Sequence, residues 1–184
     1  MGARAALLHA ISQPEYWDAL ILISATAGLE SETECKQRAV HDRALAERLL
    51  SEGITDFLSY WQQTPIIQSQ QNIRADWLEQ MQSNRRQHTA KGLAASLQQF
   101  GQAHYPNIWP ELGKLDCPVL LITGEQDAKY CAFAKRMKKR LPNAQWKSIP
   151  GAGHMPHLEA PEQTAAVIKC FRNAIFQNGT TGTA

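Results

Sequence analysis

Two strand–helix pairs near the C-terminus restrict the fold of this chain more than any other feature. A short apolar run at residues 117–123, CPVLLIT, predicts a buried strand, and a helix is expected from about residue 128 to 141. AQWKSIP at 144–150 predicts a second strand, and a glycine-rich turn then leads to a last helix over about 160–176. Strands that alternate with helices form a parallel sheet with crossover helices. The pattern therefore indicates an α/β protein.

The earlier part of the chain predicts one more strand and a helical insertion. Apolar residues in MGARAALLHAI recur at helical spacing until Pro14, and WDALILISA at 17–25 predicts a buried strand. Between Ser31 and about Leu112 we expect only helices, with prolines as the breaks. The expected organisation is a core helix and strand over 1–26, a helical cap over 27–111, a C-terminal core over 112–176 and a disordered tail over 177–184.

Composition excludes several classes of partner. The chain has 19 basic and 17 acidic residues among 184, which gives no field that would favour nucleic acid. No apolar stretch is long enough for a membrane span. The four cysteines are widely spaced, which is typical of reduced thiols in a cytoplasmic protein rather than of a disulfide framework or a zinc site. We expect no metal and no cofactor.

Asp127 and His154 are the candidate catalytic residues, because each follows a predicted strand at the edge where parallel sheets bind ligands. Taken alone, Asp127 is a good helix N-cap, and a single histidine in a glycine turn says little. Together they follow the order in which α/β-hydrolases complete a catalytic triad, acid first and histidine second. In such a triad the carboxylate holds the imidazole in one tautomer, so that its other nitrogen can accept a proton from a serine hydroxyl.

The nucleophile is the member that this sequence does not supply. No serine fits the G-x-S-x-G pattern, yet the chain opens with Met-Gly-Ala-Arg and enters a helix at once. An elbow that ends in this way would place a serine immediately before Met1. The Met1 amide would then donate to the oxyanion, and Gly2 would allow strand and helix to cross closely. The alternative is an ordinary initiator methionine before an alanine-rich helix.

Seven segments of the chain carry a family resemblance. They are Met-Gly-Ala-Arg at 1–4, HDRALA at 41–46, FLSYWQQTP at 57–65, GLAASL at 92–97, WPEL at 109–112, GEQD at 124–127 and GAGH at 151–154. Together they resemble one family, the MenH-type 2-succinyl-6-hydroxy-2,4-cyclohexadiene-1-carboxylate synthases of menaquinone and phylloquinone synthesis. The glycine-flanked pieces around Asp127 and His154 are shared by the whole α/β-hydrolase superfamily, whereas the cap pieces are specific to this family. The resemblance implies the C-terminal part of an α/β-hydrolase fold, with its last three parallel strands and an inserted helical cap.

The resemblance also implies a chemistry, which is the elimination of pyruvate from a substrate that carries several carboxylates. Arg4, Arg43 and Arg85 fall where the family places carboxylate-binding arginines, and a guanidinium fork suits a carboxylate. Each could instead be an ordinary surface arginine. The family's Arg-x-x-Asn appears here as RRQH at 85–88, so spacing leaves open whether Arg85 or Arg86 faces the substrate.

Tyr60 and Trp61 would line the substrate cavity from the cap, or would pack the cap onto the sheet. His154 and His157 could resemble a metal pair, but no third ligand is in view.

Two further interpretations stay open at this point. The chain could derive from another α/β-hydrolase, one that cleaves carbon–carbon bonds or esters, or it could be a non-catalytic remnant or binding module. In the preferred interpretation the chain is a fragment that is inactive by itself, and a complementing N-terminal segment is a possible partner. Its substrate would be a small polycarboxylate.

Overall fold

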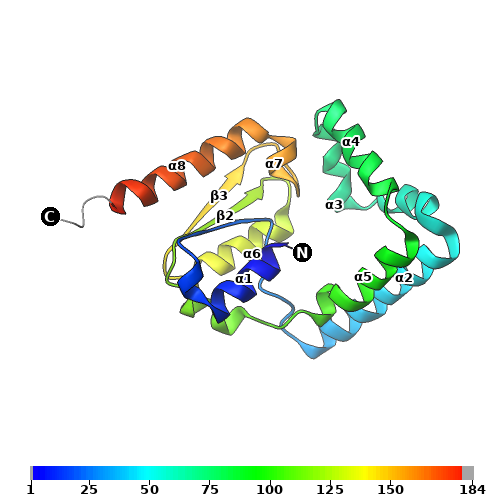
Figure 1. Cartoon of the computed structure of the whole chain (residues 1–184), viewed down its shortest axis with the longest axis horizontal. Helices are drawn as coiled ribbons and strands as arrows, with labels where there is room; N and C mark the ends of the chain where they lie inside the picture. Colours follow the sequence, from blue (N-terminus) through cyan, green and yellow to red (C-terminus); the bar gives the residue numbers. More distant parts are fainter. Residues whose placement is uncertain (1, 180–184) are drawn as a thin grey trace.

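The computed structural model describes residues 2–179, and its core is a small parallel sheet with helices on both faces (Figure 1). The three strands are β1 (Leu20–Ile23), β2 (Val119–Gly124) and β3 (Ala144–Ile149), in the order β1-β2-β3. Both pairings are parallel, with Leu22 opposite Leu121 and Leu121 opposite Trp146. The predicted α/β class is therefore confirmed, and each predicted strand lies where the apolar runs indicated.

The central strand β2 is buried on both faces, as its uninterrupted run of apolar residues requires. Alternate side chains enter two different cores because successive residues of a strand point to opposite faces. Val119 and Leu121 pack in the core formed with α1 (Gly2–Ser12), η4 (Trp109–Lys114) and α6 (Ala128–Lys138), whereas Leu120 and Ile122 pack against α8 (Pro161–Gly179). Residues 177–179 of the expected tail belong to α8 in the structure, and residues 180–184 lie outside the described residues.

The long middle segment forms a helical cap beside the sheet (Figure 1). Its largest element is α2 (Glu32–Trp61), which begins with a capping box between Ser31 and Glu34 and is broken at Gly53, where φ is 82°. The cap continues through α3 (Pro65–Gln68), η2 (Ser69–Asn72), α4 (Ala75–Arg86), α5 (Ala90–Phe100) and η3 (Gln102–His104). Helices α2 and α5 share a small core of their own.

Two short elements complete the described chain, η1 (Pro14–Tyr16) before β1 and α7 (Pro156–Glu159) before α8. Among residues 2–179, no helix combines the length and the apolar character that crossing a membrane would require.

Candidate active site

Asp127 and His154 meet at the C-terminal edge of the sheet. The Nδ1 atom of His154 lies 2.6 Å from Oδ2 of Asp127, and the side chain of Asp127 is only 10% exposed. The other carboxylate oxygen, Oδ1, accepts a hydrogen bond from the backbone N–H of Tyr130 at 3.3 Å and so caps α6. The cap function and the histidine contact are therefore not alternatives, because one carboxylate performs both with different oxygens.

A glycine at the end of β2 allows this meeting. A Cβ atom on Gly124 would lie 2.1 Å from the carbonyl oxygen of Gly153 and 2.2 Å from that of Ala152. Real Cβ atoms do not approach backbone oxygens so closely, so only glycine fits here. The strand end can therefore lie directly against the loop that holds His154.

The His154 loop is also held from the far side, by Glu159 and by the cap. Glu159 Oε1 accepts a hydrogen bond from the backbone N–H of Met155 at 3.0 Å, and Oε2 accepts one from that of Gly153. The hydroxyl of Ser69, on η2 of the cap, donates to Glu159 Oε1 at 3.1 Å. This carboxylate fixes the loop and joins it to the cap.

A cavity of about 810 Å³ opens beside His154, between the core and the cap. Its walls come from α1, the end of β1, α2, the α3–η2 segment, α4 and the start of α6. Gly2, Arg4, Tyr60, Trp61 and Arg85 of the predicted site residues line it. Met1 lies outside the described residues, so its expected oxyanion role stays a prediction.

Arg4 and Arg85 enter this cavity without an acidic partner. Burial lowers the pKa of both guanidinium groups, and within residues 2–179 neither forms an ion pair with a carboxylate. Arg85 donates to the side-chain oxygen of Gln70 at 2.8 Å and lies over the ring of Trp61, at 4.9 Å from its centroid. Arg86 is exposed, so Arg85 is the member of the pair that faces the cavity.

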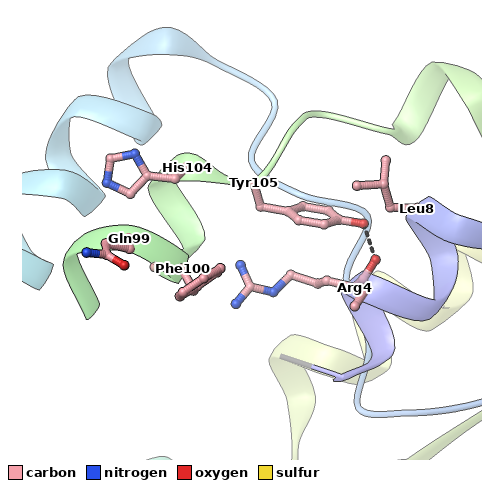
Figure 2. Close-up of a pocket in the computed structure, with 8 residues that line it drawn as sticks. Arg4, Leu8, Gln99, Phe100, His104 and Tyr105 are labelled. Carbon is pink, nitrogen blue, oxygen red and sulfur yellow. Dashed lines mark hydrogen bonds between the residues drawn. The ribbon is translucent and has the colours of Figure 1, made fainter. Parts of the chain in front are cut away.

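Arg4 lies between aromatic side chains. Its guanidinium is 5.2 Å from the ring centroid of Tyr105, and the Tyr105 hydroxyl donates to the Arg4 backbone oxygen. Figure 2 shows the same guanidinium reaching toward Phe100, along a smaller pocket of about 220 Å³ between α1 and the α5–η3 segment. One nitrogen, Nη1, is buried and has no hydrogen-bond partner among the described residues. A buried donor without an acceptor is costly, so the folded chain pays an energetic cost at Arg4.

Arg43 does not join this group, because its side chain is exposed and lies outside the cavity lining. The arginine that α2 presents to the cavity is Arg38. It donates to Asp42 Oδ1 and to the side-chain oxygen of Gln102, both at 2.8 Å. Sequence reasoning missed Arg38, although its i,i+4 spacing from Asp42 could have indicated a paired, inward-facing arginine.

Ser24 and Tyr130 also line the cavity, and neither was a predicted site residue. Ser24 follows β1 with a φ of 47°, which is uncommon outside glycine, and its hydroxyl donates to the backbone oxygen of His154 at 2.8 Å. Tyr130 follows Asp127 on α6 and packs edge-on against the His154 ring. Within residues 2–179, no hydrogen bond joins Nε2 of His154 to a serine hydroxyl.

His157 lines the same cavity, and burial lowers its pKa. Among the described residues, no group of three or more His, Cys, Asp or Glu side chains is placed to hold a metal ion.

Comparison with known proteins identifies the family of this chain. The profile of the alpha/beta hydrolase family matches residues 1–167. The chain belongs to the alpha/beta hydrolase family. Proteins of this family commonly carry a triad whose acid and histidine follow strands, and Asp127 and His154 lie at strand ends in that order.

Within the alpha/beta hydrolase family, the chain is similar to 2-succinyl-6-hydroxy-2,4-cyclohexadiene-1-carboxylate synthases. A Bacillus subtilis protein provisionally given this name is 37% identical over 175 residues, which cover 95% of this chain and 64% of the relative. The synthase of Enterobacter sp. is 33% identical, over 91% of this chain and 62% of its own length. The structure of MenH from S. aureus matches with a TM-score of 0.89 at 31% identity, over 94% of this chain and 65% of that one.

These matches confirm the resemblance to the MenH-type synthases. They also show that the chain spans slightly less than two thirds of the length of these relatives.

Proposed function

We propose that this chain contributes the acid, the histidine and the substrate-binding cap of a synthase that eliminates pyruvate. The substrate would be 2-succinyl-5-enolpyruvyl-6-hydroxy-3-cyclohexene-1-carboxylate, in menaquinone or phylloquinone synthesis. The observation that carries the proposal is the cavity beside His154, in which two half-buried arginines, Arg4 and Arg85, have no carboxylate partner among residues 2–179.

The charges of the cavity fit such a substrate. The proposed molecule carries three carboxylates, on its succinyl chain, on its ring and on its enolpyruvyl group. Arg4, Arg38 and Arg85 approach the cavity from α1, α2 and α4, so they can bind carboxylates that point in different directions. An apolar ester would leave these guanidinium groups without anions, which disfavours an esterase.

The Asp127–His154 pair supplies the proton chemistry. Asp127 accepts the hydrogen bond from Nδ1 of His154, so Nε2 is left free to take up a proton. In the proposed reaction a base that His154 activates removes the ring proton next to the succinyl carbonyl. The electron pair forms a new ring double bond, the existing ring double bond moves by one position, and the carbon–oxygen bond to the enolpyruvyl group breaks. Protonation of the departing enolate then gives pyruvate.

The serine and the oxyanion donors would come from a complementing segment equivalent to the part of the relatives that this chain does not match. In that proposal the chain alone is inactive and the assembled pair is active. The four free cysteines, Cys35, Cys117, Cys131 and Cys170, agree with a cytoplasmic location, which we include in the proposal.

Pyruvate release tests this function directly. The purified chain would be assayed alone and after mixing with the unmatched N-terminal part of the Bacillus subtilis relative, with lactate dehydrogenase as the reporter of pyruvate. We expect release only in the mixture, and its loss when the chain carries His154→Ala. Hydrolysis of simple esters by the mixture without release of pyruvate would contradict the proposal and favour an esterase.

A further inference from the structure

Tyr130 occupies a fixed position between the catalytic pair and the cavity. Its ring centroid lies 4.5 Å from that of His154, at an interplanar angle of 61°, and 5.6 Å from that of Phe133, at 83°. Its backbone N–H donates to Asp127 Oδ1. Two edge-to-face ring contacts and a bonded backbone restrict the motion of the phenol. The position of its hydroxyl is therefore restricted as well.

The Tyr130 hydroxyl is a neutral donor that lacks an acceptor. Tyr130 lines the cavity with Arg4 and Arg38, and within residues 2–179 no hydrogen bond engages its hydroxyl. Burial, and to a smaller extent the charge of Asp127, raise its pKa, while the weaker effects of Arg38 and Arg4 oppose the rise. The phenol is thus protonated at neutral pH, and it shares the cavity lining with both arginines.

We propose that Tyr130 is a specificity residue whose hydroxyl donates a hydrogen bond to the ligand carboxylate held by Arg4 and Arg38. This inference rests on the proposed function, which it deepens. Arg4 and Arg38 attract any anion, whereas the Tyr130 phenol, which packs against the His154 ring, adds one hydrogen-bond donor with a defined direction. A ligand that places a carboxylate oxygen within reach of the Tyr130 hydroxyl accepts its hydrogen bond. Any other ligand leaves the hydroxyl unpaired in a partly desolvated site.

A single atom, the hydroxyl oxygen, distinguishes the proposed hydrogen-bonding role of Tyr130 from a packing role of its ring. Tyr130→Phe keeps the ring that packs on His154 and Phe133 and removes only the donor. Tyr16→Phe is the matched control, since Tyr16 is 71% exposed and lies outside the cavity.

Calorimetry of the 184-residue chain with 2-succinylbenzoate tests the inference, because this stable dicarboxylate keeps the succinyl and ring carboxylates of the proposed product. A hydrogen bond to a charged group is worth enough that its loss should raise Kd about tenfold or more in Tyr130→Phe. Tyr16→Phe should bind like the wild type.

The two possible failures are distinguishable. Binding by the wild type with a Kd within twofold of that of Tyr130→Phe would overturn the role of Tyr130 and leave the polycarboxylate site intact. If the wild type does not bind 2-succinylbenzoate, both the role of Tyr130 and the proposed polycarboxylate site are overturned. Because a variant can also lose affinity through altered folding, a second measurement uses the unaltered chain with ring-labelled tyrosine. The nuclear magnetic resonance signal absent from Tyr130→Phe should shift when 2-succinylbenzoate is added, and an unmoved signal at saturation would refute the inference.

Discussion

Replacing Gly124 by alanine should separate the side chains of Asp127 and His154 while leaving both in the sequence. The new Cβ would lie 2.1 and 2.2 Å from the carbonyl oxygens of Gly153 and Ala152, whereas ordinary contact begins at 3.4 Å. The strand end and the loop must therefore move apart by about 1 Å. A shift of that size, added to the 2.6 Å between His154 Nδ1 and Asp127 Oδ2, gives about 3.6 Å, which is beyond the range of a hydrogen bond.

The consequences can be measured in two ways. Overpacking of this kind costs about 1–3 kcal/mol, and each kcal/mol lowers the melting temperature of a chain of this size by about 2–4 °C. We expect Gly124→Ala to melt about 2–12 °C below the wild type, and the low-field proton signal of the His154 Nδ1–H group to be lost. Gly113→Ala is the matched control, because its Cβ would meet nothing closer than 3.9 Å. Equal melting temperatures for the two variants, with the proton signal retained in Gly124→Ala, would refute the close approach.

Three further outcomes are expected. Trp109→Phe removes the buried donor that binds the Gly28 carbonyl at 3.1 Å, which should cost about 1–3 kcal/mol and be visible as a lower melting temperature. Burial raises the pKa of Tyr105 from 10.0 to about 12, so the neutral phenol favours folding. The corresponding stability is complete below pH 10 and is lost as the pH rises to about 12, and Tyr105→Phe should lose less stability over that range in thermal melts. Arg85→Gln should leave the unliganded chain at least as stable, because it removes a half-buried cation, yet raise the Kd for 2-succinylbenzoate about tenfold in calorimetry.

The core could be predicted from sequence because its signals are local. The run at 119–122 is apolar at every position, and such a run is typical of a strand covered on both faces. Asp127 and His154 could be placed from the order of strands alone, since neighbouring parallel strands end at one edge of a sheet. The short helix α7 escaped prediction because its four residues offer no periodicity.

The cap was less predictable, and Arg43 shows the physical reason. Helix α2 turns by about 100° per residue, so an arginine five positions from the inward-facing Arg38 points away from it. Composition does not distinguish the two, because both are arginines in a polar helix. The face of α2 that packs on α5 decides which arginine points toward the cavity. This helix–helix contact joins residues far apart in the chain. Asp42, buried beside Arg38, marks the inward face.

The two halves of the site differ in how their charges are satisfied, and this difference links the fold to the proposed function. In the core half, Asp127 and His154 satisfy each other. In the arginine-bearing half, Arg38 has Asp42, but Arg4 and Arg85 are partly desolvated and form no ion pair with a carboxylate among residues 2–179. A chain selected for stability alone would replace or pair such cations. Their presence around one cavity is therefore best explained by an anionic ligand that completes the pairing, and a neutral substrate would leave that cost without compensation.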